Sequence, residues 1–379
     1  MVRQRVVLLL SVAVVALAAG AADRNELRLD QLQLSPHLLV AGNGRGDVVT
    51  YDPSSRRAQL WSGEGVLLAE QRFADLRLDG EPYDMTARGD RALLAFFDAD
   101  AGGANRRRMV VVEYVTGRVK SSFFVDGVTM AMTGRDTGWV LVVRRPWSEA
   151  SSPSEWGAFA LRVVNDEGKV TDELELPKAL QEAVESSGLS SPGAWLVRPF
   201  ALGETIWLVP AAVYQLWRPQ QGARPARGVD PPPCLAARGR QLAGEEAEQE
   251  LLRRVRGASR ETQQRMRDFL DRSRASGRPP SGFMGVAPAV AVAGQRVAVV
   301  VRGEHDRCRV DVWDMGLETP LLGVPLQPGS CPGTVVLHRT GVWIREGDHM
   351  RSLPLPLELP PPDDPCPPPP DSPRSSQAQ

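Results

Sequence analysis

The feature that most constrains the fold of this chain is a short pattern of strands and turns that recurs six times along the sequence. In each copy an apolar strand ends at a glycine-containing turn, a second apolar strand follows, and a loop leads to a third strand. The six first strands, each with the glycine of its turn, are His37–Val40 with Gly42, Tyr83–Thr86 with Gly89, Met130–Met132 with Gly134, Trp195–Val197 with Gly203, Val290–Val292 with Gly294, and Val335–Leu337 with Gly341. The recurrence predicts one supersecondary unit used six times.

The second strands of these copies are nearly continuous runs of β-branched and aromatic residues, as in Trp139–Val142 and Ile206–Val209. Such runs suit strands that are covered on both faces, and glycines interrupt them too regularly for buried helices. Units of roughly 40 to 50 residues with four strands are typical of propeller blades. The sequence therefore predicts an all-β fold, a six-bladed β-propeller. The sixth copy lacks an obvious last strand, and we expect the alternating segment Leu27–Leu34 to supply it.

The two ends of the chain differ in composition from the repeats. Two arginines, an apolar run and a cluster of small residues follow one another at the start of the chain, which is the order of a signal peptide. The far end is dominated by proline and cannot build a core. We therefore divide the chain into a signal peptide (1–22), a propeller (23–359) with a helical insertion between blades four and five (about 244–280), and a disordered Pro-rich tail (360–379).

Three segments resemble parts of a known group of proteins. Tyr51–Gly65 and Val163–Val170 are similar to the inter-strand turns of exported bacterial six-bladed propellers with NHL-like repeats. The charged insertion Gly244–Pro280 also resembles that group. The resemblance implies the propeller fold, but this architecture hosts enzymes, binding proteins and scaffolds alike. Several blades depart from the repeat, so no binding residue is carried over from the group.

Charge and cysteines narrow the class of protein further. The formal net charge is −1, so no global field attracts nucleic acid, and we expect no nucleic-acid partner. Cysteines in an exported chain tend to pair. Four cysteines allow three pairings, and the sequence leaves all three open. It favours Cys308 with Cys331, because one begins a third strand and the other lies in the next connection between blades; Cys234 would then be left with Cys366. The protein is then periplasmic or secreted, with no stable membrane anchor after signal cleavage.

One face of the predicted propeller receives all the long connections. In a propeller the loops from second to third strands and those between blades emerge on one face, which we call the loop face, and the remaining turns emerge on the other, the turn face. The long loop-face segments are 98–108, 144–156, 177–194 and 220–288. Long loops in a compact domain are usually functional or disordered. The helices of the insertion then form either a lid or partner-docking pair, or a plug that merely covers this face.

The candidate ligand-binding residues are charged or aromatic residues predicted on the loop face. They are His37, Tyr83, Asp84, Arg144, Arg145, Trp147, Trp195, His305, Asp306, Asp348 and His349. Tryptophans could stack on a sugar or an aromatic ligand, and neighbouring arginines suit an anionic group. Histidines beside aspartates could bind a metal, but adjacent residues on separate blades do not have the spacing of a zinc site. We therefore expect no metal and no cofactor.

No motif of a catalytic nucleophile occurs in the chain, such as the Gly-x-Ser-x-Gly elbow. The sequence thus favours a non-catalytic, extracytoplasmic propeller that binds a protein partner or a small ligand on its loop face. The alternative is a metal-assisted hydrolase or lactonase with its site in the central channel, motivated by the histidines and aspartates. A structural envelope component without a ligand site is a third hypothesis.

Overall fold

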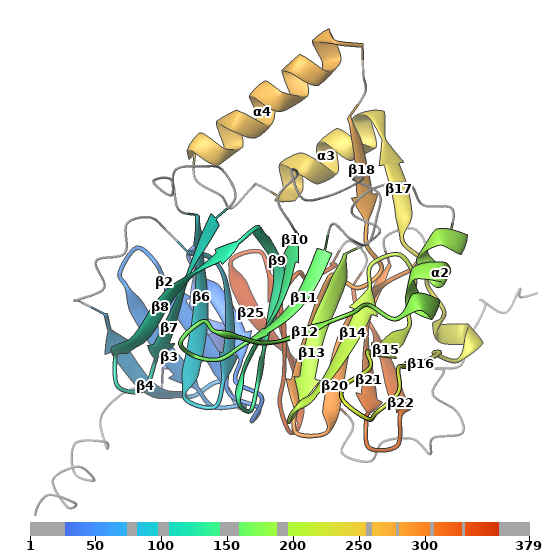
Figure 1. Ribbon diagram of the computed structural model, residues 1–379. Coiled ribbons are helices and arrows are strands. Elements are labelled where there is room, and N and C mark those ends of the chain that lie inside the picture. The colour runs from blue at the N-terminus through green and yellow to red at the C-terminus, as the bar shows by residue number, and fades with distance from the viewer. Residues whose placement is uncertain are drawn as a thin grey trace, which may run out of the picture.

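The computed structural model describes nine stretches of the chain: 27–73, 82–97, 106–144, 159–187, 196–254, 260–277, 280–303, 307–327 and 330–355. They form a six-bladed β-propeller, as the repeats predicted (Figure 1). Each blade is an antiparallel sheet whose strands follow one another in sequence order. The predicted signal peptide (1–22) and Pro-rich tail (360–379) lie outside the described residues.

The first three blades each have four strands. Blade one contains β1 (Leu39–Gly42), β2 (Val48–Asp52), β3 (Arg57–Trp61) and β4 (Leu67–Arg72). Blade two contains β5 (Pro82–Arg88), β6 (Arg91–Phe97), β7 (Arg106–Glu113) and β8 (Arg118–Asp126). Blade three contains β9 (Val128–Arg135), β10 (Gly138–Arg144), β11 (Phe159–Val164) and β12 (Val170–Leu174).

Blades four and five also have four strands, and blade six has three among the described residues. Blade four contains β13 (Val197–Leu202), β14 (Thr205–Pro210), β15 (Leu216–Arg218) and β16 (Arg227–Val229). Blade five contains β19 (Ala289–Ala293), β20 (Arg296–Arg302), β21 (Cys308–Asp314) and β22 (Thr319–Pro325). Blade six contains β23 (Val335–Leu337), β24 (Gly341–Glu346) and β25 (His349–Pro354).

The core of the propeller is divided among the six junctions between neighbouring blades. One cluster of buried apolar side chains fills each junction, so every sheet is covered on both faces. This explains why the second strands are continuous apolar runs: β10 and β20 have almost no exposed residue. Four of the largest fully buried side chains are tryptophans in these junctions: Trp61, Trp139, Trp313 and Trp343.

The described residues close the ring between blades six and one with three strands in blade six. The prediction that Leu27–Leu34 forms the last strand of this blade is wrong, because Leu29–Gln31 form a 3-10 turn (η1) that lies against β25. Within this segment Leu29 and Leu34 are buried in the junction with Trp61 and Trp343, whereas Leu27 is 42% exposed. Leu29 and Leu34 are five residues apart, so a continuous strand would have put them on opposite faces, whereas the turn allows both to be buried in this junction.

An arginine of blade six holds the closing segment, which we define as residues 27–38, the stretch that leads into β1. Arg345 on β24 donates hydrogen bonds from its guanidinium to the carbonyl oxygens of Leu38 (2.6 Å), Ser35 (2.9 Å) and Pro36 (3.4 Å). Burial lowers its pKa, and the negative charge of Asp348 opposes this effect. The indole nitrogen of Trp343 donates to the Gly63 carbonyl, 2.7 Å away, and so ties blade six to blade one.

In the part of the chain that the structure describes, the α-helices lie in connections on the loop face. Helix α2 (Lys178–Ser186) follows blade three and buries Leu180 and Val184. Between blades four and five the predicted helical insertion is confirmed as α3 (Gly244–Arg254) and α4 (Arg260–Ala275). The helices are carried by the strand pair β17 (Arg240–Ala243) and β18 (Ser281–Met284), which follows the short η5 turn (Pro233–Leu235). None of the described helices is long and apolar enough to span a membrane.

The predicted disulfide between Cys308 and Cys331 is confirmed. It joins the start of β21 to the connection that leads into blade six. Cys234 is disulfide-bonded as well, and its expected partner Cys366 lies outside the described residues.

A buried polar network links blades four and five. The carboxylate of Asp311 on β21 accepts a hydrogen bond from Arg309 Nε, 2.8 Å away, and the Tyr214 hydroxyl accepts one from Trp313 Nε1 at 2.7 Å. Burial raises the pKa of Asp311 to about 6, although the charge of Arg309 and hydrogen bonds from Arg309 and Tyr214 lower it. At neutral pH this carboxylate is therefore ionised at a cost to the folded state.

We expect Arg345→Gln to lower the free energy of unfolding by about 2 to 3 kcal/mol, because it removes charge-assisted hydrogen bonds that hold the closing segment. Urea denaturation measures this change. The control is Arg351→Gln on the same blade, which breaks a half-exposed pair with Glu346 and should cost less than about 1 kcal/mol. Equal losses in both variants would contradict a special role of Arg345 in ring closure.

The network around Asp311 predicts a pH dependence of stability. The folded pKa of about 6 lies above the unfolded value of about 3.9, so the stabilising contribution of Asp311 is fully present below pH 4 and is lost as pH rises to 6. Between pH 4 and pH 7 the wild type should lose about 2 kcal/mol relative to Asp311→Asn. Urea denaturation of both proteins between pH 4 and 7 tests this, and parallel pH profiles would refute it.

Candidate functional site

The concave site that all six blades form together is the central channel. Its volume is about 430 Å³, and the first strands of the six blades (β1, β5, β9, β13, β19 and β23) line it. Small and apolar side chains such as Val40, Met132 and Val290 line the middle of the channel. Charged side chains are confined to its two ends, and the two groups differ in how they are neutralised.

At the loop-face end, the charged lining residues among those described are Asp84 on β5 and Arg198 on β13. The strand register places them there. Asp84 pairs with Ala95 and Arg198 with Val209, near the ends of β6 and β14 that run towards the loop face. The two residues belong to blades two and four, so they approach the channel from either side of blade three.

The surroundings of Asp84 compensate the negative charge of its carboxylate only in part. Burial raises its pKa, while a hydrogen bond from the Met85 amide (2.8 Å) and the positive charge of Arg198 lower it without cancelling the effect. A carboxyl group with a raised pKa in a cavity is a candidate for ligand binding or proton transfer. Together, Asp84 and Arg198 provide one acidic and one basic group at the loop-face mouth of the channel.

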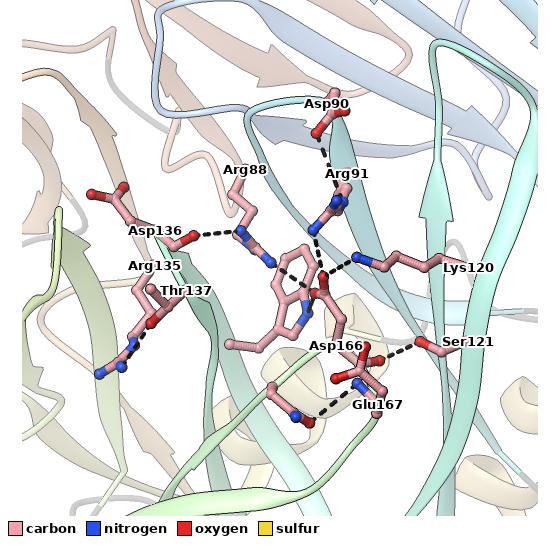
Figure 2. A network of polar contacts seen from close by, with 12 residues as sticks. Arg88, Asp90, Arg91, Lys120, Ser121, Arg135, Asp136, Thr137, Asp166 and Glu167 are labelled. Atoms are coloured by element: carbon pink, nitrogen blue, oxygen red, sulfur yellow. Dashed lines mark hydrogen bonds and ion pairs between the residues drawn. The ribbon is translucent and has the colours of Figure 1, made fainter.

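At the turn-face end, the channel-lining residue Arg88 belongs to a network centred on Asp166 (Figure 2). The carboxylate of Asp166 accepts hydrogen bonds from Arg88 (2.7 Å), Arg91 (2.5 Å), Lys120 (2.8 Å) and Trp139 Nε1 (3.0 Å). Burial raises the pKa of this group, but the hydrogen bonds from Lys120 and Arg88 and the charges of both arginines outweigh burial and lower it. The network joins blades two and three, and its carboxylate is saturated with donors.

Of the predicted site residues on the loop face, the structure places Asp84 in the channel and Tyr83 beside it in the junction of blades two and three. The Tyr83 hydroxyl donates a hydrogen bond to the Thr129 carbonyl (3.3 Å), and burial raises its pKa to about 12. Tyr83 therefore ties two blades together. Arg144 is the last residue of β10, and it does not belong to the channel lining.

The structure does not bring the described histidines of the loop face to the channel. His37 lies in the closing segment, where its amide donates to the Ser35 hydroxyl. His349 begins β25, and its ring nitrogen lies 3.2 Å from the carboxylate of its neighbour Asp348. Among the residues that the structure describes, no group of three metal-ligating side chains is found.

Five of the predicted site residues lie outside the described parts of the chain, so their predictions stay as they were. These are Arg145, Trp147, Trp195, His305 and Asp306.

The sequence analysis missed Arg198. Its first strand for blade four stopped at Val197, whereas β13 runs on to Leu202. A signal was present, because Arg198 interrupts an otherwise apolar first strand just as Asp84 does in blade two. A charged residue in a first strand, where apolar or small residues are usual in this chain, marks the channel lining.

No protein-family model and no curated protein sequence matches this chain. Solved structures share the propeller fold at low similarity. A protein of unknown function from Bacteroides thetaiotaomicron is 10% identical, with a TM-score of 0.45, over 86% of this chain and 71% of that one. Virginiamycin B lyase from Staphylococcus aureus is 14% identical, with a TM-score of 0.41, over 87% and 98%. The RRP9 WD40 repeats are 10% identical, with a TM-score of 0.41, over 84% and 89%.

Replacing Asp84 and Asp166 by asparagine should change the free energy of unfolding at pH 7 in different directions. The raised pKa of Asp84 means that its contribution to stability is present below pH 4 and is lost as pH rises, so Asp84→Asn should be at least as stable as wild type at pH 7. The lowered pKa of Asp166 means that its contribution is present at neutral pH and is lost on acidification. Asp166→Asn should therefore cost roughly 3 kcal/mol at pH 7, because it leaves buried cations unpaired.

Urea denaturation of the two variants at pH 7 and pH 4 measures both effects. A loss of stability in Asp84→Asn as large as that in Asp166→Asn would identify Asp84 as a structural ion-pair partner and would remove it from the candidate site.

Proposed function

We propose that this protein is a non-catalytic binding module that holds a protein partner on its loop face through the helical arm, the segment 240–284 formed by β17, α3, α4 and β18. The propeller fold supports a binding or scaffold role in general. The observation that carries the more specific proposal is the position of the arm: α3 and α4 stand above one face of the ring, with α4 farther from it than α3 (Figure 1).

The helical arm is attached to blade four at its base, and α4 is its outer helix. Backbone hydrogen bonds tie its base to blade four, from Gly239 to Ala212 (2.7 Å) and from Val286 to Ala211 (2.8 Å). Helix α3 packs on β17 and β18, and α4 packs on α3. Leu270 is buried, and Arg274 forms an ion pair with Glu248 across the two helices. A rigid base with an outward helix suits docking into a partner better than plugging the channel.

The outer surface of α4 combines one large apolar side chain with positive charge. Phe269 is 48% exposed. Arg265 and Arg272, four residues before it and three after it, are exposed and lie on the same helix face by spacing. Such a surface complements an apolar pocket with an acidic rim. We therefore infer that the partner offers a pocket of this kind.

A small polar ligand in the channel is the second candidate function, and Asp84 with Arg198 favours it. A cavity in which an acidic and a basic group converge can orient a small polar ligand of complementary charge. The acidic and basic groups lie at the mouth on the loop face, so a ligand bound there would lie beneath the side that carries the arm. One binding face would then serve both kinds of partner.

We also propose that the protein acts outside the cytoplasm. The disulfides of Cys308 and Cys234 support this location, because disulfides persist in oxidising compartments. The order of charged, apolar and small residues in 1–22 supports export.

We expect Phe269→Ser to reduce capture of the partner about tenfold, because truncating an apolar anchor residue removes the centre of the interface. In-cell cross-linking of tagged protein, followed by quantitative mass spectrometry, measures capture. The matched control is Leu317→Ser, which removes an apolar side chain that is 66% exposed in the β21–β22 turn on the opposite face. This control should capture the same proteins as wild type.

A second variant removes the arm without opening its base. Because Ala243 pairs with Ser281, and the Gly244 amide donates to the Pro280 carbonyl (3.0 Å), residues 244–280 can be replaced by an Asn-Gly turn that closes a hairpin. Specific capture should disappear in this variant while the propeller stays folded. An unchanged set of captured proteins would rule out the arm as the docking element.

A further inference from the structure

The Cys308–Cys331 disulfide joins two sulfurs in different environments. Cys308 begins β21 and is 3% exposed, whereas Cys331 lies in the connection between blades five and six and is only partly buried. Their Cα atoms are 5.3 Å apart. An attacking thiolate can therefore reach the sulfur of Cys331 more readily than that of Cys308.

A buried guanidinium contacts the more accessible sulfur. Arg302 is the last residue of β20 and lies opposite Cys308 in the strand register. It is 7% exposed, and its Nε donates a hydrogen bond to Cys331 Sγ at 3.2 Å. A purely structural disulfide does not need a cation against one of its sulfurs, since a neutral disulfide gains little from it. A thiolate at the same position gains a great deal.

We propose that Cys308–Cys331 is a thiol–disulfide exchange site that dithiols reduce, with Cys331 as the exchanging cysteine, Cys308 as the resolving cysteine and Arg302 as the residue that stabilises the Cys331 thiolate. This goes beyond the proposed binding function and does not depend on the partner of the helical arm.

The exchange balances in two steps. A thiolate of the dithiol attacks Cys331 Sγ, a mixed disulfide forms, and Cys308 leaves with the electron pair of the broken bond and takes up a proton. The second thiol of the reductant loses its proton and attacks the reductant's own sulfur in the mixed disulfide. Cys331 then leaves as a thiolate beside Arg302. The protein has gained two electrons, and the dithiol has become a cyclic or linked disulfide.

The position of the bond connects its redox state to the candidate site. Shortly after Cys331 the chain passes Gly333 and Thr334, which line the central channel, and then enters β23. The disulfide is a covalent tether between this stretch and β21 of blade five. Reduction releases the tether at the loop-face end of the channel, near the end where Asp84 and Arg198 lie.

The test uses the full protein equilibrated in mixtures of reduced and oxidised dithiothreitol. Alkylation followed by peptide mass spectrometry measures the reduced fraction at Cys331 and, as an internal reference, at Cys234. We expect Arg302→Gln to lower the equilibrium constant for reduction at Cys331 about tenfold, a shift of about 30 mV, and to leave Cys234 unchanged. Arg302→Lys keeps the positive charge and should retain most of the wild-type constant.

A pH profile separates thiolate stabilisation from a packing role. In reduced wild-type protein the rate of Cys331 alkylation should reach half its maximum well below pH 8.5, the ordinary value for cysteine, and the midpoint should rise in Arg302→Gln. An unchanged equilibrium constant and midpoint in this variant would overturn the proposal. If Arg302→Gln does not fold, the wild-type midpoint alone decides: a value at or above 8.5 overturns the proposal and a lower value supports it.

Discussion

Closure of the ring is the constraint on which the rest of the molecule depends. A blade buries its two faces only if it has a neighbour on each side, so the apolar runs of all six second strands require the junction between blades six and one to form. Among the described residues, no strand from the start of the chain joins blade six at this junction. Leu29 and Leu34 fill it, Arg345 holds the carbonyls of the entering segment, and Gly65, at φ +81°, leaves room for the Trp343 ring, which a Cβ would approach to 2.7 Å.

The carboxylates of Asp166 and Asp84 have opposite effects on the stability of the fold. Asp166 is held by four donors from two blades, and its lowered pKa reflects a charge that the folded state stabilises. Asp84 has one amide donor and a more distant guanidinium, and burial dominates its pKa. The first arrangement lowers the free energy of the fold. The second raises it, which is the usual cost of a polar group placed where a ligand can reach it.

The parts of the structure that could be predicted from sequence are those set by local patterns. The blade number and the second strands follow from runs of β-branched residues punctuated by glycine, and the insertion helices follow from spacing. The disulfide followed from the repeat, because the blades fix where Cys308 and Cys331 lie. The closing segment was mistaken for a strand, because its alternating leucines have the period of a strand while their burial is decided by Trp61 and Trp343, far away in sequence. The placement of Asp84 and Arg198 at the same end of the channel also depends on how three blades are arranged around it, which no local pattern encodes.

The asymmetry between the two faces explains why the candidate sites gather on one of them. The described turn-face connections are short, and their side chains are used in contacts between blades, as in the Asp166 network. Loop-face connections can lengthen without disturbing a sheet, and the chain lengthens them into α2 and the helical arm. The mouth of the channel with Asp84 and the connection with Cys331 lie on this same side. A ligand, a partner protein and a reductant would therefore all bind or react on the loop face, whereas the turn face provides contacts between neighbouring blades.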